Sequence, residues 1–435
     1  MILRKYRNIE KAFISKSALS NEFIAANSLF NSVTFRLDKN AATDRFLALR
    51  IIKEVVQSLF KKIEIQYIDR QASVAILDNT FDYIDKRVKY VEKLNAEKVK
   101  LVINKSKQLG FTSLLGVFQS LVAIMFFSFK APFVLRNNVL RTNYWLLLKQ
   151  IPEIINFLAI VKREKIKVVY DFANYEVDSN FLFLLLKERG VHVVKVPSPG
   201  PLFGHNRNLL ADTLVVCSGY QLEEIKLYKE TIRYDKLISF YPELAKLEIK
   251  PNVSFDKDKF SVIGFYSHAS WLREKHSHSD NGLNLLIAEE SLLKTIGSAF
   301  VNSEFRLLIF LHPREKKDLE QTKEYYKAFL SNISYEFAPF ELKSTECYHL
   351  CNLALITLST ILFERIFEGY KILISTDGMI GFPHKNSVLS SICFSSANEL
   401  NELIEINIQK SNEDFFESNH LSSYTSKIFI PNEYQ

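Results

Sequence analysis

The sequence contains few cysteines, and they do not form a pattern typical of a disulfide framework or a zinc site. Four occur in 435 residues, at Cys217, Cys347, Cys351 and Cys393, and no CxxC pair is present. This usage indicates a reducing, cytoplasmic compartment. Cys347 and Cys351 lie four residues apart on an expected helix, which leaves a metal or redox pair open, but buried apolar thiols are the better interpretation.

Other common signals are also absent. The first residues lack the apolar core of a signal peptide, and there is no internal repeat or low-complexity tract. Neither a GxGxxG nor a Walker motif occurs, which counts modestly against a dinucleotide-binding enzyme. The formal net charge of +7 is too mild to indicate a nucleic-acid partner, and it suits an anionic small ligand or an anionic membrane surface.

Residues 109–129 carry no charged side chain and are marginally long enough to span a bilayer. Gly110, Gly116 and Gln119 interrupt the apolar run, so a buried helix is the best interpretation. A hairpin at the membrane surface comes second and a true span third. We therefore expect a cytoplasmic protein, with a peripheral position at the inner membrane as the alternative.

The residues that are present suit a packed protein of two domains, or three at most. The sequence is 47% hydrophobic and 24% charged, with 35 Phe and 19 Tyr to fill large cores. Short apolar runs alternate with helical patterns over residues 166–229 and again over residues 260–408, which predicts βαβ units and parallel sheets. The polar, Pro-containing residues 235–257 are the expected linker.

We expect an α/β protein with an acceptor-binding domain at residues 1–240, whose helix-rich first part precedes a Rossmann-like core. A nucleotide-sugar-binding, Rossmann-like domain follows at residues 258–410. Residues 411–435 form a tail that is expected to pack back on the first domain. Within the first domain, the apolar residues of 80–108, including Val88 and Val99, are spaced as one face of a helix.

An apolar run at residues 305–311 stops at His312 and Pro313, and Arg314 follows. Pro ends the strand and holds the preceding residue extended. A histidine at the carboxyl end of a parallel strand can face a phosphate, and it can stabilise the charge on a departing nucleotide by a hydrogen bond or as an acid. An isolated His-Pro pair is more often a surface feature.

A second run at residues 353–357 is followed by Ser359, Thr360 and an expected helix that contains Glu364. Hydroxyls and unpaired N–H groups at a helix N-terminus can hold a phosphate, although one of the two hydroxyls can serve only as the cap. Glu364 lies one turn further on and can bind a ribose diol. Its alternative is a solvated helix position.

A third polar turn follows the run at residues 260–266. Ser267, His268 and Ser270 can hydrogen-bond a phosphate, and Arg273 can pair with a phosphate or carboxylate. Trp271 can stack on a sugar or base, or it can lie in the core at a capped helix start.

The general base is expected in the first domain. Asp171 ends the run at residues 166–170, and Glu176 and His205 lie in the turns that follow two expected strands. Each of them taken singly is better explained as structural. Asp178 is better explained as an N-cap.

Two Rossmann-like halves joined by a linker resemble the GT-B architecture of glycosyltransferases. The His312-Pro313 pair, the later Ser359-Thr360 pair and Glu364 resemble the nucleotide site of bacterial sialyltransferases and Kdo transferases, over residues 260–395. The acidic motif that supplies the base in those families has no clear match in this sequence.

The resemblance implies transfer of an acidic sugar, Kdo or another nonulosonate, from a CMP-activated donor to a hydroxyl of a lipopolysaccharide or capsule glycan. It implies no cofactor or metal besides the donor nucleotide sugar, and it implies no nucleic-acid partner. The alternatives are a CDP-glycerol type of polyol-phosphate transfer, UDP- or GDP-sugar transfer, and a non-catalytic binding protein of the same fold.

Overall fold

The computed structural model describes most of two separate α/β regions. The described residues are 65–78, 84–95, 97–104, 153–173, 179–197, 208–216, 219–239, 261–275, 285–301, 303–342, 344–379 and 388–424, with isolated positions before residue 26 and at 118 and 122. We call the region up to residue 239 the first lobe and the region from residue 261 onward the second lobe.

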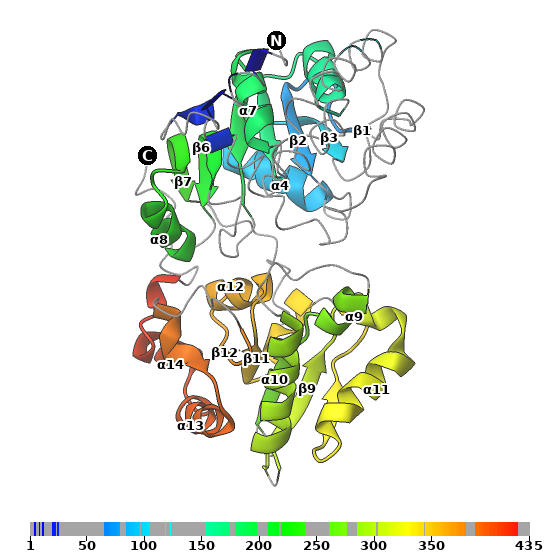
Figure 1. The fold of residues 1–435 in the computed structure, drawn as a ribbon, viewed down its shortest axis with the longest axis vertical. Coiled ribbons are helices and arrows are strands. Elements are labelled where there is room, and N and C mark those ends of the chain that lie inside the picture. Colours follow the sequence, from blue (N-terminus) through cyan, green and yellow to red (C-terminus); the bar gives the residue numbers. More distant parts are fainter. Residues whose placement is uncertain are drawn as a thin grey trace.

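The first lobe contains a seven-stranded sheet in the order β1-β3-β2-β4-β5-β6-β7 (Figure 1). Its strands are β1 (Ile65–Tyr67), β2 (Val74–Asp78), β3 (Val99–Asn104), β4 (Val168–Asp171), β5 (His192–Lys195), β6 (Leu209–Val216) and β7 (Ile232–Ser239). Only β1 is antiparallel to its neighbour. Because β3 and β4 flank β2 on opposite sides, the strand order reverses between β2 and β4, which is where open α/β sheets bind ligands.

The second lobe contains a six-stranded parallel sheet in the order β10-β9-β8-β11-β12-β13. Its strands are β8 (Val262–Tyr266), β9 (Arg306–Phe310), β10 (Tyr335–Phe337), β11 (Leu353–Ile356), β12 (Ile372–Ser375) and β13 (Cys393–Phe394). This is the strand order of dinucleotide-binding sheets, with the reversal between β8 and β11. The prediction of an α/β protein with two parallel-sheet domains is confirmed.

Helices bury both sheets, as continuous apolar strands require. The first lobe uses residues 153–163, α4 (Ile84–Asn95), α7 (Ser179–Lys187) and α8 (Gly219–Leu227). The second uses α9 (Ser270–Lys275), α10 (Leu285–Ala299), α11 (Leu319–Leu330), α12 (Thr360–Phe367), α13 (Ala397–Asn407) and α14 (Asn412–Ser418), with short 3₁₀ segments between them, including η4 (Ser344–Leu350) and η6 (Ser422–Tyr424). Gly369 ends α12 with φ +79°, the left-handed conformation expected there.

Two local predictions are wrong. Val99 does not continue a helical face, because α4 stops at Asn95 and Val99 begins β3 inside the sheet. Residues 235–239 do not belong to the linker, because β7 runs to Ser239. β7 is the edge strand of its sheet and its exposed residues are polar, so it has the composition of a linker.

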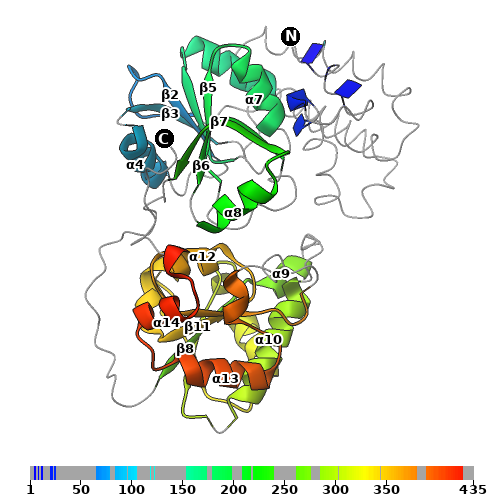
Figure 2. The ribbon, with the colours of Figure 1, turned by 90° about the vertical axis from the view of Figure 1, so that its left-hand side faces the viewer.

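The carboxyl edges of the two sheets face each other. α4 follows the carboxyl end of β2, α12 follows that of β11, and Lys86 at the start of α4 interacts electrostatically with Glu364 in α12. A second link joins the lobes where the hydroxyl of Tyr424 in η6 donates to Glu223 Oε1 of α8 at 2.7 Å. Figures 1 and 2 show α4 and α8 at the end of the first lobe nearest α12. Two parallel α/β lobes with facing carboxyl edges form the expected GT-B architecture.

Residues 109–129 fall almost wholly outside the described residues, with only Phe118 and Val122 included, both exposed. No helix among the described residues is long and apolar enough to cross a membrane. Peripheral contact with a membrane therefore stays a prediction.

Candidate functional site

The candidate site lies at the carboxyl edge of the second sheet, where the turns after β8, β9 and β11 meet. β8 pairs with β9 on one side and β11 on the other, in parallel, so these three turns are neighbours. The ladder extends one residue beyond β8, since Ser267 N–H donates to the Phe310 carbonyl at 3.1 Å. The structure therefore brings the three predicted polar turns to one edge.

Glu315, which follows the His-Pro pair, connects two of these turns. Its side chain is fully buried, and its carboxylate accepts from Trp271 Nε1 at 2.9 Å, from the Tyr326 hydroxyl at 3.0 Å and from His312 N–H at 2.9 Å. Burial raises the pKa of Glu315, and the hydrogen-bond donors around its carboxylate make this rise smaller. This role of Glu315 is not predicted from the sequence, although its carboxylate lies three residues after the histidine.

His312 is half-buried at the end of β9, and its ring orientation is defined by the next turn. The backbone N–H of Arg314 donates to His312 Nδ1 at 3.2 Å. A neutral imidazole held this way carries its proton on Nε2, which makes Nε2 a hydrogen-bond donor. Pro313 and Arg314 are exposed beside it.

The turn after β8 is largely occupied by its own contacts. The N–H groups of His268 and Ser270 donate to the buried carboxylate of Glu289 at 2.6 and 3.3 Å, and the Ser267 hydroxyl accepts from Ala269 N–H at 2.9 Å and hydrogen-bonds Glu315. The hydroxyl of Ser267 and the backbone N–H of His268 thus stabilise a tight turn with Ala269 at φ 53°, and the predicted binding of phosphate by Ser267 and His268 side chains stays a prediction.

Trp271 belongs to the core and not to the surface of the site. Its ring stacks on Tyr325 with centroids 4.8 Å apart, and its N–H is bound to Glu315. The predicted stacking of Trp271 on a sugar or base is wrong for that reason. Arg273 lies in α9, and its side chain is outside the described residues.

Three buried hydroxyls at this edge have no hydrogen-bond partner in the described part of the chain. They are Ser270 Oγ in the turn after β8, Thr357 Oγ1 immediately after β11 and Ser375 Oγ at the end of β12. A buried hydroxyl without a partner costs free energy, so each of these three groups requires a water molecule or a polar ligand as its partner. Of the three residues, only Ser270 is among those predicted from the sequence.

Three of the predicted residues lie at or near the start of α12, where Ser359 is the helix cap and Thr360 and Glu364 belong to the helix. Ser359 Oγ accepts from Ile361 N–H at 3.4 Å, which makes Ser359 the N-cap. Thr360 is exposed at the first helical position. Glu364 is half-buried and accepts from the Tyr348 hydroxyl at 3.0 Å, and burial raises the pKa of its carboxyl.

A buried guanidinium holds α12 against the sheet. Arg365 is fully buried and donates to the Tyr266 hydroxyl at 3.0 Å and to the carbonyls of Tyr348 and Lys371 at 3.2 and 3.1 Å. It also lies over the rings of Tyr266, Tyr348 and Tyr370. These contacts fix the orientation of Glu364, the preceding residue, toward the first lobe.

The facing edge of the first sheet is also polar. Four strands that are adjacent in space end in buried polar residues, which are Asn104 on β3, Asp78 on β2, Asp171 on β4 and Lys195 on β5. Asp171, the predicted base, accepts from the Ser179 hydroxyl at 2.6 Å and from Ala173 N–H at 2.9 Å. Asp78 was not predicted, and it pairs with Arg87 Nε at 3.0 Å. Glu176 and His205 lie outside the described residues.

The cysteines and possible metal ligands give no second chemistry in the described part of the chain. Cys347 and Cys351 are buried free thiols, and burial raises the pKa of both, that of Cys347 to about 11. Cys347 lies within the 3₁₀ segment η4, and Cys351 follows its last residue. Both side chains are buried, so the expected buried-thiol interpretation is confirmed. No group of three metal-ligating side chains occurs among the described residues.

No protein-family model matches the sequence, and no curated protein matches it significantly. Similar solved structures include a UDP-GlcNAc 2-epimerase from Methanocaldococcus jannaschii in complex with UDP-GlcNAc and UDP, at 13% identity and TM-score 0.46, covering 78% of this chain and 93% of that one. They also include the lipopolysaccharide outer core galactosyltransferase WaaB, at 12% identity and TM-score 0.43, covering 82% of this chain and 96% of that one. Acinetobacter baumannii MurG is similar at 11% identity and TM-score 0.43, covering 81% of this chain and 95% of that one. These TM-scores are below 0.5, so the architecture stated above rests on the strand order and the facing edges.

Proposed function

We propose that this protein is a GT-B glycosyltransferase that takes its sugar from a nucleotide-activated donor. The observation that supports this most strongly is the set of partnerless buried hydroxyls at Ser270, Thr357 and Ser375, beside His312 at the edge where the sheet order reverses. Hydroxyl groups and an imidazole N–H are suitable partners for the oxygens of a donor phosphate.

In the proposed reaction a base removes the proton of an acceptor hydroxyl, whose oxygen attacks the anomeric carbon of the donor sugar. The bond from that carbon to the phosphate oxygen breaks, and the nucleotide leaves with the electron pair. His312 stabilises the new negative charge through Nε2–H, and the hydroxyls at the ends of β8, β11 and β12 are the proposed partners of other oxygens of the donor. Asp171 is the proposed base, since it ends the central β4 on the facing edge.

For the donor we propose a CMP-linked acidic sugar, Kdo or another nonulosonate, with a lipopolysaccharide or capsule glycan as acceptor. The support is the pattern of His312-Pro313 and Ser359-Thr360. Glu364 is the proposed partner of the ribose diol, because it is half-buried on α12 and its carboxyl interacts electrostatically with Lys86 of the first lobe. A UDP-sugar, a GDP-sugar and CDP-glycerol are the alternative donors.

The nucleotide is identified by thermal shift with CMP, CDP, UDP and GDP, followed by release of nucleotide from CMP-Kdo and CMP-sialic acid. Binding at 100 times Kd adds about 2.7 kcal/mol of stability, which such a scan detects. Stabilisation by cytidine nucleotides alone supports the CMP-linked donor, and stabilisation by UDP or GDP indicates a UDP-sugar or a GDP-sugar as the donor instead. No stabilisation by any nucleotide contradicts the proposal.

A non-catalytic binding protein is the second candidate. It is favoured by the turn after β8, whose N–H groups are already bound by Glu289 and so are not donors for a ligand. This candidate predicts nucleotide binding, or none, without transfer to an acceptor hydroxyl. A nucleotide that binds and whose sugar conjugate is turned over excludes it.

A further inference from the structure

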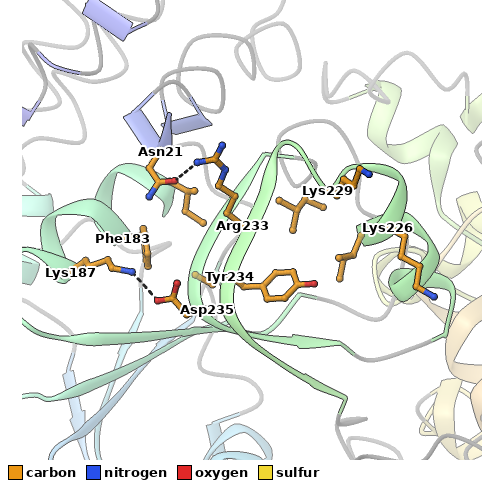
Figure 3. A pocket seen from close by; sticks show the side chains of 12 residues that line it. Asn21, Phe183, Lys187, Lys226, Lys229, Arg233, Tyr234 and Asp235 are labelled. Carbon is orange, nitrogen blue, oxygen red and sulfur yellow. Dashed lines mark hydrogen bonds and ion pairs between the residues drawn. The ribbon is translucent and has the colours of Figure 1, made fainter. Parts of the chain in front are cut away.

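A basic pocket of about 770 Å³ lies in the first lobe (Figure 3). It lies between α7, α8 and the first residues of β6 and β7. These are the amino ends of the two strands, whereas the candidate site faces the carboxyl edges. The pocket is therefore separate from the proposed donor and acceptor sites.

The floor of the pocket is apolar. Phe183, Leu210, Ala211, Ile225 and Ile232 line it, and each of them is buried in the lobe. Tyr234 projects among the lining residues in Figure 3 and is 37% exposed. A pocket of several hundred Å³ with an apolar floor and a few polar groups has the size and composition of a small-molecule site.

Four cationic side chains line the pocket together with one carboxylate, and only one of these cations is neutralised by a carboxylate among the described residues. Lys187 Nζ is bound by Asp212 at 2.9 Å and Asp235 at 3.0 Å, and the hydrogen bond that it donates to Asp212 is the main cause of its raised pKa. Arg233 donates instead to the neutral amide oxygen of Asn21 at 3.1 Å.

The other two cations come from the end of α8 and the turn after it. Lys226 and Lys229 are exposed, and neither has an ion-pair partner in the part of the chain that the structure describes. Figure 3 shows them on the side of the pocket opposite Lys187, with Arg233 and Tyr234 between. Three cations that have no carboxylate partner in the described part of the chain therefore line a pocket with an apolar floor.

The neighbouring hollow provides a contrast. It measures about 460 Å³ and shares Asn21, Lys187 and Arg233 with the pocket. Its own cation, Lys5, is paired with Glu188 at 2.8 Å and lies 3.7 Å from Glu22. The cation that belongs to the neighbouring hollow alone is therefore neutralised, whereas Lys226 and Lys229 of the pocket have no ion-pair partner among the described residues.

We propose that this pocket binds a phosphate-bearing ligand, with the phosphate between Arg233, Lys226 and Lys229 and an apolar portion on the floor. A phosphate carries more than one negative charge and several acceptor oxygens, which matches three cations better than a single carboxylate does. The source of the phosphate is either a free organic phosphate or the headgroup of an anionic lipid.

The test uses the full chain and two probes with a multiply charged phosphate, inorganic pyrophosphate by calorimetry and phosphatidic acid vesicles by sedimentation. The Lys226→Gln/Lys229→Gln double variant removes two exposed cations that have no described partner, so the fold is retained. The matched control is Lys323→Gln/Lys327→Gln on α11, which makes the same charge change on exposed positions of the second lobe.

We expect the pocket variant to weaken binding of at least one probe by about tenfold or more, as the loss of charge-assisted hydrogen bonds predicts, while the control binds like wild type. Weaker binding of pyrophosphate by the pocket variant identifies a free organic phosphate as the ligand. Weaker binding of vesicles alone identifies a lipid headgroup. Equal weakening in the pocket and control variants, unchanged binding in the pocket variant, or no binding of either probe by wild type overturns the proposal.

Discussion

The carboxylate of Glu315 holds the backbone of His312, with 2.9 Å between Glu315 Oε2 and His312 N. The same carboxylate binds Trp271 and Tyr326, so the His-Pro turn is tied to the turn after β8 and to α11. A histidine whose main chain is fixed in this way loses little freedom when it meets a ligand. Pre-organisation of this kind is what a stabiliser of transition-state charge requires.

Replacement of His312 by Ala tests its catalytic role. We expect turnover to fall by about 10²–10³, the effect of losing one donor to a developing charge, with an unchanged unfolding midpoint. His349→Ala, which removes a half-buried imidazole of the same lobe, is the control. Turnover of His312→Ala close to that of wild type would remove His312 from the mechanism.

Glu315→Gln tests the buried carboxylate through pH. Because the folded-state pKa of Glu315 is raised, the folded protein keeps a proton that the unfolded chain loses above about pH 4.5. The contribution of this group to stability is thus complete below the unfolded-state pKa and is lost as pH rises through the folded-state pKa.

Urea unfolding from pH 4 to pH 8 measures that contribution. Relative to Glu315→Gln, which cannot titrate, the wild-type free energy of unfolding should decrease as pH rises. Glu320→Gln, at an exposed position of α11, serves as the control. Parallel profiles for wild type and Glu315→Gln would show that Glu315 is ionised equally in both states.

Asp171→Asn and Asp78→Asn separate two carboxylates at the facing edge. Asn keeps an oxygen for Ala173 N–H and a group for the Ser179 hydroxyl, so the fold should survive at Asp171. We expect turnover to fall by about 10²–10⁴ for Asp171→Asn and by less for Asp78→Asn, whose carboxylate is engaged by Arg87. Equal turnover in Asp171→Asn and wild type would move the base elsewhere, with Glu176 and His205 next to be tested.

Lys371 tests the packing beneath the site. Its buried ammonium donates to the carbonyls of Asn407, Ile408 and Lys410 at the end of α13. Lys371→Met removes these three bonds and should cost about 2–4 kcal/mol of unfolding free energy. Lys327→Met, at an exposed position, should cost nothing measurable.

The same lysine has a second signature in its pH dependence. Burial, with a smaller effect of Lys410, lowers the pKa of Lys371 to about 8 from its ordinary 10.5. Between these values the unfolded chain binds the extra proton, so the contribution of Lys371 to stability grows as pH rises from 8. The difference in unfolding free energy between wild type and Lys371→Met should increase from pH 8 to pH 9.5, and a constant difference would contradict the assignment.

The sequence was informative where local pattern and final position coincide. The runs that became β8, β9 and β11 are apolar throughout because both faces are buried, and their polar ends predicted the site edge. β2 was missed although Val74–Asp78 ends in an acid as clearly as β4 does. Its place beside β4 comes only from the tertiary pairing, which no local pattern encodes.

Side-chain partners could not be predicted for the same reason. Trp271 stacks on Tyr325, and Ser267 and Trp271 both bind Glu315, across more than forty residues of chain. Thr357 is an ordinary strand-end residue in the sequence. Its significance appears only when burial shows that its hydroxyl has no partner among the described residues.

Thr357→Val uses that property to test the central proposal, that the carboxyl edge of the second sheet holds a nucleotide. Val has nearly the same shape and lacks the hydroxyl, so loss of this partnerless group should leave the free protein as stable as wild type or slightly more stable. Thr322→Val, which removes a buried hydroxyl that donates to the Glu315 carbonyl at 3.0 Å, should cost about 1–3 kcal/mol.

The deciding measurement is the calorimetric Kd of wild type and Thr357→Val for the nucleotide that stabilises wild type most among CMP, CDP, UDP and GDP. We predict a Kd raised about tenfold in Thr357→Val, the loss of one hydrogen bond to a charged group, with stability undiminished. An unchanged Kd in a stably folded Thr357→Val protein would contradict a nucleotide site at this edge.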